Sequence, residues 1–404
     1  MQRITISRDD DLYEAFADIA QTPDGILVVT YRESLRHGPQ PFSRVVVRRS
    51  HDEGRTWEPK RTVVERTEEQ QLAGEGMLNC SRLLCAADGT LYLAVDLLYK
   101  PEVEPDPGMI LLFRSGDGGA TWEGPQETGI TWGIVPSLKQ LSDGDLLLGV
   151  TRIHFPTGKR ADMREQQLVY RSRDLGATWE GPAAIPDPAT PSANGLPWRL
   201  NEGDFVELDD GTVVCYMRED AEQLSGWKSL SADGGRTWSV PIRAQMKACL
   251  GRPSAGRLRS GEIAITYRYG AGVSHSLALH VETPAEAART GPVDRDQWAE
   301  DFHQARTAFL DNDRAVCPDT GYSGWVQLAS GDLYVVNYVT DDAPRAQIRG
   351  YLVSRSDWYL YPEGDIWWYH PRDNGAYIAT ARAHAEAQYR RARQRSGGRV
   401  PSAK

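Results

Sequence analysis

The octapeptide SHDEGRTW at residues 50–57 recurs three times further along the chain. The copies read SGDGGATW at 115–122, SRDLGATW at 172–179 and SADGGRTW at 231–238, so their starts are 65, 57 and 59 residues apart. In the shared form S-x-D-x-G-x-T-W, Asp and Gly favour a tight turn, and Thr and Trp begin a strand whose indole can pack on its neighbours. We therefore interpret these boxes as structural turns that carry no chemistry.

A second repeat, a polar–glycine turn followed by an apolar strand, alternates with the boxes. Each copy follows another strand-like run, which indicates a β-hairpin. The six copies are DGILVVTY (24–31), DGTLYLAV (88–95), DGDLLLGV (143–150), DGTVVCYM (210–217), SGEIAITY (260–267) and SGDLYVVN (330–337). Six hairpins, four of them followed by a box, predict an all-β chain folded as a six-bladed β-propeller. A short strand over Ile4–Ser7 is expected to close the ring by joining the last blade.

Two segments interrupt this periodicity. Residues 283–312 have a helical composition and predict a small helical insertion between blades five and six. Residues 375–404 predict a C-terminal helix with a basic tail. We therefore expect one propeller domain over 1–374 followed by this tail, and the insertion is a candidate contact for a homo-oligomer.

Composition narrows the classes of partner. A net charge of −10 disfavours nucleic acid and anionic membranes. The N-terminal residues lack the features of a secretory signal, and no run reaches the roughly 18 apolar residues of a membrane span, so we expect a cytoplasmic protein. The cysteines match neither a disulfide framework nor a metal-binding spacing, so we expect reduced thiols and no metal or cofactor: Cys80, Cys85, Cys215, Cys249 and Cys317.

Four boxes in a six-bladed frame resemble the sialidase (neuraminidase) superfamily, and the resemblance covers residues 1–360. The box also occurs in propellers without enzymatic activity, so function has to be argued from the site. In this superfamily the pocket lies at the end of the propeller that gathers the starts of the first strands, the ends of the second strands and the loops after them.

The resemblance is strongest in blades four and six. LNEGDFVELDDGTVVCYMRED (200–220) is similar to a superfamily stretch in which a Glu opens the first strand and an Arg ends the second, which implies that Glu202 is a base and that Arg218 grips a carboxylate. TGYSGW (320–325) implies that Tyr322 is a catalytic tyrosine, since a neighbouring Glu can take the proton of a phenol as it attacks. The alternatives are a structural ion pair between Glu202 and Arg218, and an aromatic wall residue at Tyr322.

Blade five offers two more arginines for an acidic substrate. Arg252 opens its first strand and Arg268 ends its second, and the superfamily places its third arginine after the strand that ends at Arg268. Guanidinium groups bind carboxylates with two parallel hydrogen bonds. The alternative for each is a surface arginine.

Blade one departs from the superfamily pattern. The superfamily has an Arg-Ile-Pro motif ten residues before the turn glycine, where this chain has Ala15, and an acidic Asp in a loop that here reads TYRESLRHGPQPFSR (30–44). Arg32 is a candidate for the missing cation, and Glu33 or His37 for the general acid. The same end of the propeller is also expected to receive further polar side chains as substrate-binding candidates: Asp18, Arg152 and His154.

These residues support three hypotheses. The first is an exo-acting, retaining glycosidase that removes a terminal acidic sugar, sialic-acid-like or uronate-containing, with Tyr322 and Glu202. The second is a lyase on uronate-containing glycans that uses His37, His154, Tyr322 and Arg218. The third is a glycan-binding propeller without turnover. In all three the expected partner is a small, acidic carbohydrate or oligosaccharide.

Overall fold

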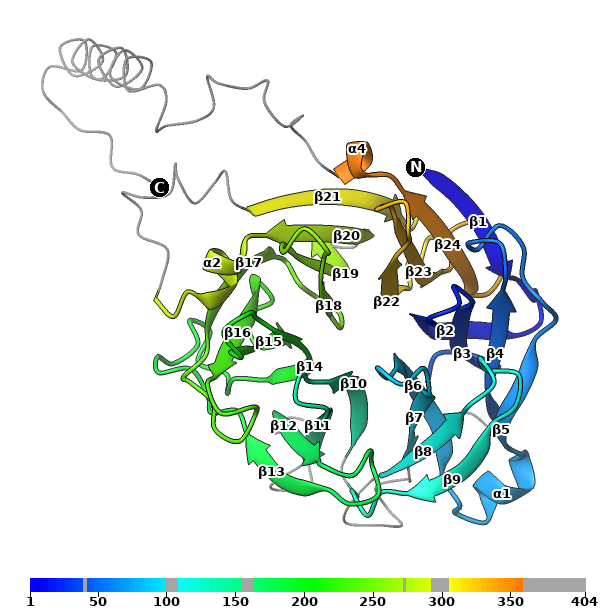
Figure 1. Cartoon of the computed structure of the whole chain (residues 1–404), viewed down its shortest axis with the longest axis horizontal. Coiled ribbons are helices and arrows are strands. Elements are labelled where there is room, and N and C mark those ends of the chain that lie inside the picture. The colour runs from blue at the N-terminus through cyan, green and yellow to red at the C-terminus, as the bar shows by residue number, and fades with distance from the viewer. Residues whose placement is uncertain are drawn as a thin grey trace, which may run out of the picture.

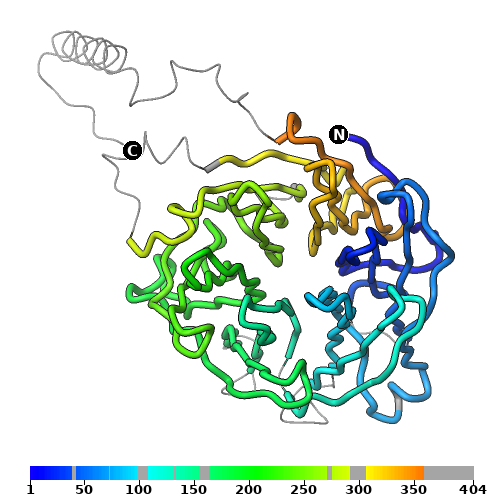
Figure 2. Tube along the Cα trace, in the orientation of Figure 1, coloured from blue at the N-terminus to red at the C-terminus, as the bar shows by residue number. Residues whose placement is uncertain are grey.

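The computed structural model describes residues 1–38, 42–98, 108–131, 133–154, 163–271, 274–291 and 305–358. In these residues, six antiparallel sheets of four strands each stand around a common axis (Figure 1). The chain passes through the sheets in order, and the tube of Figure 2 shows their inner strands converging on the centre of the ring. The six-bladed propeller predicted from the two repeats is therefore confirmed.

The first three blades use the first half of the chain. Blade one consists of β2 (Tyr13–Gln21), β3 (Leu27–Ser34), β4 (Ser43–Ser50) and β5 (Arg61–Arg66). Blade two consists of β6 (Met77–Cys85), β7 (Leu91–Leu98), β8 (Met109–Ser115) and β9 (Glu123–Glu127). Blade three consists of β10 (Ile134–Gln140), β11 (Leu146–His154), β12 (Arg164–Ser172) and β13 (Glu180–Ala184).

The other three blades follow in the same way. Blade four consists of β14 (Leu200–Glu207), β15 (Val213–Glu219), β16 (Ser225–Ser231) and β17 (Ile242–Lys247). Blade five consists of β18 (Ser254–Arg257), β19 (Ile263–Ala271), β20 (Ser274–Glu282) and β21 (Ala305–Asn312). Blade six consists of β22 (Thr320–Gln327), β23 (Leu333–Val339), β24 (Gln347–Val353) and the N-terminal strand β1 (Gln2–Ser7).

The strand β1 closes the ring. It pairs antiparallel with β24, from Gln2 opposite Leu352 to Ser7 opposite Ile348. In Figure 1 the blue β1 lies along the orange β24, so the start of the chain completes the last blade. The closure expected from the strand over Ile4–Ser7 is confirmed.

The boxes lie at the turns between the third and fourth strands of blades one to four. In the first box, the Ser50 hydroxyl donates to Asp52 (2.8 Å) and accepts from the backbone N–H of Gly54 (2.8 Å). The Asp52 carboxylate accepts from the backbone N–H (2.8 Å) and the hydroxyl (2.6 Å) of Thr56. All of these bonds are local, in agreement with a purely structural turn.

The segment expected as a helical insertion, 283–312, is helical only in part. Helix α2 covers Pro284–Ala288, whereas Ala305–Asn312 forms β21 and pairs with β20 as the outer strand of blade five. The sequence ARTAFLDN has no clear strand alternation, and its pairing with β20 overrides its weak local preference. Residues 292–304 and the expected C-terminal helix over 375–404 lie outside the described residues.

Two further short helices, α1 (Glu68–Leu72) and α4 (Arg355–Trp358), connect or follow blades. No helix within the described ranges is long and apolar enough to cross a membrane. All five cysteines are free, and Cys317 is exposed while the other four are buried or half-buried.

The apolar core is divided among the seams between neighbouring blades. In the seam between blades six and one, Ile6, Tyr31 and Tyr334 belong to one buried cluster. In the seam between blades two and three, Ile110 and Leu148 belong to another buried cluster. Burying one large apolar side chain contributes about 1.5–3 kcal/mol, so each blade is stabilised mainly by its two neighbours.

Candidate functional site

One end of the propeller collects the starts of the innermost strands and the ends of the second strands, opposite the end that carries the boxes. In every blade, the residues nine before and seven after the turn glycine between these strands fall at this end. From blade one to blade six, the first position holds Phe16, Cys80, Val135, Glu202, Arg252 and Tyr322. The second position holds Arg32, Asp96, Thr151, Arg218, Arg268 and Tyr338.

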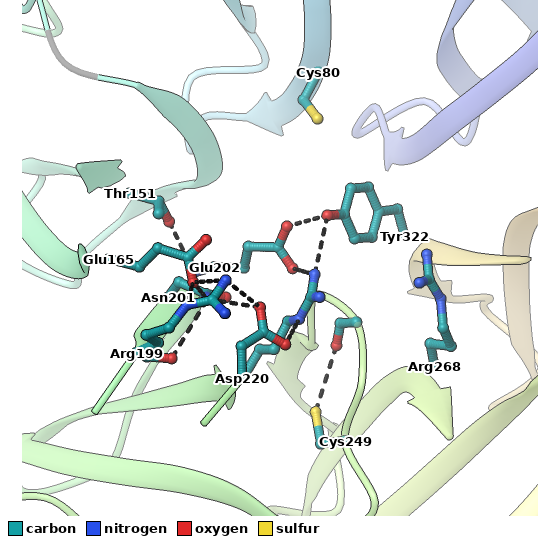
Figure 3. Close-up of polar contacts among 12 residues, drawn as sticks. Cys80, Thr151, Glu165, Arg199, Asn201, Glu202, Asp220, Cys249, Arg268 and Tyr322 are labelled. Carbon is teal, nitrogen blue, oxygen red and sulfur yellow. Dashed lines mark hydrogen bonds and ion pairs between the residues drawn. The ribbon is translucent and has the colours of Figure 1, made fainter. Parts of the chain in front are cut away.

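Glu202 and Tyr322 lie on opposite sides of a shared hydrogen bond (Figure 3). The Tyr322 hydroxyl donates to Oε1 of Glu202, and Nη1 of Arg218 lies 3.0 Å from Oε2 of Glu202 and 3.5 Å from the Tyr322 oxygen. Glu202 is 3% exposed and Tyr322 is 8% exposed. The structure therefore brings together a phenol, a carboxylate and a guanidinium, all three of which the sequence predicted.

The phenol of Tyr322 is held in its protonated form. Burial raises its pKa well above the usual value, and the negative charge of Glu202 raises it further, while Arg218 acts in the opposite direction. Tyr322 can therefore act as a nucleophile only if a base removes its proton during attack, and Glu202 is in hydrogen-bond contact to do so.

Glu202 and Tyr322 both lie in β-bulges and have a strained backbone conformation. The strand register shifts between Asn201 and Asp204 in blade four and between Gly321 and Gly324 in blade six. Within these bulges Glu202 has φ 49° and Tyr322 has φ 50°. Left-handed backbone at residues other than glycine costs about 1–3 kcal/mol and often marks a functional position.

Glu202 and Arg218 are fixed by neighbours in blades three and four. The backbone N–H of Glu202 donates to the Thr151 hydroxyl (2.8 Å), and Nε of Arg218 donates to Asp220 (2.9 Å). Asp220 also contacts Asn201 (3.2 Å). Arg218 therefore has a carboxylate on each side, and its orientation toward the phenol is set before any ligand arrives.

The two arginines of blade five lie against the ring of Tyr322. The guanidinium of Arg252 is 5.0 Å and that of Arg268 is 5.6 Å from the centroid of this ring. Arg268 donates to the carbonyl of Thr320 and to the Tyr338 hydroxyl (3.0 Å). Arg252 is completely buried, and within the described residues its Nε and Nη1 have no hydrogen-bond partner.

Blade one contributes aromatic packing to this end of the propeller. Phe16 has φ 62° and occupies the position equivalent to Glu202 and Tyr322, and its ring centroid is 5.1 Å from that of Tyr322. The guanidinium of Arg32 lies 4.4 Å from the centroid of Phe16 and is completely buried. Arg32 donates to the carbonyl of His37 (2.8 Å) and to Asn79 (3.0 Å), so it holds the loop that carries His37.

Glu33 points away from this group, because neighbouring residues of a strand face opposite sides. It is completely buried, and its carboxylate contacts Arg44 (2.5 Å) and Lys60 (2.5 Å).

Asp18 lies in β2, where it pairs with Arg82 (3.2 Å) and accepts a hydrogen bond from the backbone N–H of Leu83 (2.8 Å). Within the described residues, neither this carboxylate nor that of Glu33 forms a hydrogen bond or ion pair with Tyr322 or Glu202.

Arg152 and His154 lie at the end of β11 in blade three, after Thr151. Both are half-buried. Burial lowers the pKa of His154, and the positive charges of Arg152 and Arg164 lower it further. His154 is therefore neutral at pH 7, and the positive charge of this pair is that of Arg152.

His37 lies beside Phe16 and forms a short contact that the sequence did not predict. Its Nδ1 is 2.7 Å from Oδ2 of Asp319, which also accepts a hydrogen bond from the Tyr13 hydroxyl. Asp319 stands three residues before Tyr322, at the start of the first strand of blade six, so its position alone indicated the site end. Tyr338 could have been found from its alignment with Arg218 and Arg268 in the repeats.

Within the described ranges, no three His, Cys, Asp or Glu side chains gather as metal ligands do. The polar groups of the site are instead engaged with one another through hydrogen bonds and ion pairs (Figure 3). The chemistry that this arrangement offers is proton transfer, nucleophilic attack by a phenol and binding of an anionic group.

The comparisons with known proteins agree with the geometry of the fold. The family of the BNR repeat-like domain matches residues 25–285, and no curated protein matches the sequence. A protein of unknown function from Dyadobacter fermentans superposes with a TM-score of 0.69 at 20% identity, covering 88% of this chain and 98% of that one.

Several of the similar solved structures are sialidases by name. A Hadza microbial sialidase superposes with a TM-score of 0.61 at 16% identity, covering 87% of this chain and 68% of that one. An intramolecular trans-sialidase from Ruminococcus gnavus does so with a TM-score of 0.61 at 11% identity, covering 87% and 96%. At these identities the likeness shows a common fold.

Proposed function

Since the chain belongs to the family of the BNR repeat-like domain, we propose that it is an exo-acting glycosidase that hydrolyses a terminal acidic sugar with retention of configuration. The observation that carries this proposal is the hydrogen bond between the buried Tyr322 hydroxyl and the Glu202 carboxylate. Both residues have left-handed backbone inside a β-bulge, a conformation that is common at functional positions and that Phe16 shares in blade one.

The reaction takes two steps. In the first, the Tyr322 oxygen forms a bond to the anomeric carbon, Glu202 takes the phenol proton, and the aglycone oxygen leaves with a proton from a second group. In the second, water displaces the Tyr322 oxygen and gives a proton to that second group, and Glu202 returns the phenol proton to Tyr322. Arg218, 3.5 Å from the phenol oxygen, stabilises negative charge on that oxygen in both steps.

An acidic sugar fits the charge around the phenol. Arg218 and Arg268 flank Tyr322, and their side chains are 20% and 12% exposed, so both reach the surface of the site. Guanidinium groups on two sides of the nucleophile favour a substrate that carries a carboxylate close to the anomeric carbon.

The test compares wild type, Tyr322→Phe and Glu202→Gln on 4-methylumbelliferyl glycosides of sialic acid and of uronic acids. The wild type is expected to release the fluorophore from one of them, and each variant to lose about 10³-fold or more of kcat/KM, because nucleophile or base is absent. A fluorinated analogue of the active substrate should form a stable covalent bond to Tyr322. Mass spectrometry of the peptide that contains Tyr322 should then show the added mass of the sugar.

Tyr334→Phe is the matched control. Tyr334 is also a buried tyrosine of blade six, but its hydroxyl donates to the carbonyl of Gly54 in the first box. This variant should keep wild-type activity. A product that absorbs in the near ultraviolet would instead indicate a lyase, and tight glycan binding without turnover in the wild type would indicate a binding protein; either result would refute the glycosidase.

A further inference from the structure

A second polar cluster lies at the seam between blades six and one, apart from the Tyr322–Glu202 pair. Its centre is Asp319, whose Oδ2 contacts His37 Nδ1 (2.7 Å) and accepts from the Tyr13 hydroxyl. Its Oδ1 accepts from the Tyr338 hydroxyl (2.8 Å), and Nη2 of Arg268 is 3.9 Å away. The carboxylate therefore has donors on both oxygens.

Asp319 is held in its charged form. Burial favours the neutral acid, but the hydrogen bond and charge of His37, the charge of Arg268 and the hydrogen bond of Tyr13 outweigh burial and hold the pKa of Asp319 well below its usual range. Its backbone N–H also donates to Asp313 (3.0 Å). A fixed carboxylate acceptor orients the His37 ring and places a proton on its Nδ1.

The other nitrogen of His37 is available. The side chain is 51% exposed, and within the described residues Nε2 has no hydrogen-bond partner. The ring packs edge-on against Phe16, with centroids 5.2 Å apart, and Phe16 packs against Tyr322. His37 therefore stands on the blade-one side of the nucleophile, whereas Glu202 stands on the blade-four side, across the axis.

We propose that His37 is the general acid of this site and that Asp319 is its positioning residue; this inference rests on the proposed glycosidase function. When the bond from the anomeric carbon to the aglycone breaks, the proton on Nε2 passes to the leaving oxygen as the Tyr322 oxygen forms its bond. The neutral imidazole then takes a proton from the water that hydrolyses the glycosyl–tyrosine bond. Protons balance over the two steps, and no other reactant is needed.

Arg32 has a supporting part in this arrangement. Its guanidinium donates to the carbonyl of His37 (2.8 Å), and it is anchored by Asn79 (3.0 Å), which in turn donates to Asp96 (2.8 Å). The loop that carries His37 is thereby tied to blade two. This explains a buried arginine in blade one without assigning it to the substrate.

The test uses leaving groups of different acidity on the same acidic sugar. The dinitrophenolate of a dinitrophenyl glycoside departs without protonation. A methanol or sugar leaving group needs a proton from a general acid. His37→Gln should lose about 10²–10⁴-fold of kcat/KM on the poor leaving group and less than about 10-fold on the dinitrophenyl glycoside. Asp319→Asn should show the same split, with a smaller loss.

His51→Gln is the matched control, because His51, in the first box, is also about half exposed (52%) and contacts the carboxylate of Glu58. It should leave both substrates unaffected. Equal losses on both substrates in His37→Gln, with unchanged thermal unfolding, would overturn the assignment of the acid. If the wild type hydrolyses no glycoside, by contrast, the proposed glycosidase function itself is refuted. If Tyr322→Phe hydrolyses neither substrate while His37→Gln loses equally on both, the glycosidase function remains supported and only the role of His37 is refuted.

Discussion

Arg252 brings a guanidinium into the interior of the propeller without a balancing carboxylate. Within the described residues it forms no ion pair, and its one hydrogen bond there goes from Nη2 to the carbonyl of Ala17 (3.3 Å). Burial lowers the pKa of Arg82, and the nearby charge of Arg252 lowers it further, so the two cations repel each other. A buried, unbalanced charge destabilises a fold, whereas a cation 5.0 Å from the Tyr322 ring centroid can serve the reaction.

Replacing Arg252 should therefore change stability and activity in opposite directions. We expect Arg252→Met, which keeps most of the side-chain volume, to raise the free energy of unfolding by about 1–4 kcal/mol. The same change should lower kcat/KM about 10-fold, because a cation next to an aromatic ring contributes about 0.5–2 kcal/mol. Urea unfolding and steady-state kinetics measure the two effects.

Arg257→Met is the comparison, since Arg257 is partly exposed, lies at the end of β18, the strand that follows Arg252, and pairs with the exposed Asp209. Arg257→Met should change neither the free energy of unfolding nor kcat/KM by much. A lower stability of Arg252→Met would show that the guanidinium is satisfied by groups other than protein atoms.

Single residues also show how far the sequence predicts the site. Glu202, Arg218 and Tyr322 were predicted because each blade repeats one frame, and their spacing from the turn glycine matches a known motif. Glu33 and His37 were equal candidates for the acid, because the sequence does not show that β3 ends at Ser34, which leaves Glu33 alternating with Arg32 in the strand and His37 in the loop after it. Asp319 was missed because its role depends on a partner 282 residues away.

At the scale of the element, the boxes show how a short motif stabilises a strand connection. In the second box, Asp117 accepts from the Ser115 hydroxyl (2.8 Å) and from the backbone N–H (2.9 Å) and hydroxyl (2.6 Å) of Thr121. Burial favours the neutral acid, but these hydrogen bonds together outweigh it and lower the pKa of Asp117 to about 2.

The sign of the pH effect follows from this lowered pKa. The contribution of Asp117 is fully present above the unfolded value, about 3.9, and is lost as the pH falls through about 2. Asp117→Asn should cost about 1 kcal/mol at pH 7, and its difference from wild type should shrink between pH 4 and pH 2. Thermal unfolding over this range measures the effect, and Asp10→Asn, in an exposed pair with Arg8, is the control. A constant difference at all pH values would contradict an ionised Asp117.

The seam between β1 and blade one contains a second titrating element. Glu14 and Glu33 are both completely buried, and Lys60 lies near both carboxylates. Burial raises the pKa of Glu14 to about 8; the Ser7 hydroxyl and Lys60 lower it, and the charge of Glu33 raises it. Glu14 thus keeps its proton in the folded protein at a pH where the unfolded chain has lost it.

A raised pKa stabilises the fold at low pH, and this stabilisation is lost as the pH rises from about 4.3 through about 8. Glu14→Gln keeps the acceptor for Ser7 and should remove a slope of up to about 1.4 kcal/mol per pH unit from the stability curve. Urea unfolding at pH 5, 6.5 and 8 tests this, with the exposed Glu123→Gln as control. Parallel curves for Glu14→Gln and wild type would refute the assignment.

At the scale of the whole molecule, the fold was more predictable than the site because it is repeated. Six hairpins and four boxes repeat the same signal, so the loss of boxes from blades five and six did not hide the ring. β21 was the exception: the strand has no box before it, and its pairing with β20 could not be read from local composition. The site is built once, from blades one, four, five and six, and nothing in the sequence repeats its cross-blade contacts.

Ring closure links global stability to this site. β1 completes blade six, and Ile6, 2% exposed, shares the seam cluster with Tyr13, Phe16 and Tyr322. The contact between Tyr13 and Asp319 crosses the same seam. Removing residues 1–7 leaves the edge of β24 unpaired and exposes this cluster, so we expect a loss of several kcal/mol, because burial of Ile6 alone is worth about 2–5 kcal/mol.

We also expect the deletion to lower turnover of the active glycoside at 25 °C, because the seam that positions His37 loosens with the ring. Hydrogen exchange should show protection lost first in β24 and β2 and retained in β11 and β15, which lie in blades three and four. Ile6→Val keeps the ring closed and should cost about 0.5–1.5 kcal/mol with full activity. Full activity in the deletion variant, despite lower stability, would show that blades one and six hold the site together without the closing strand.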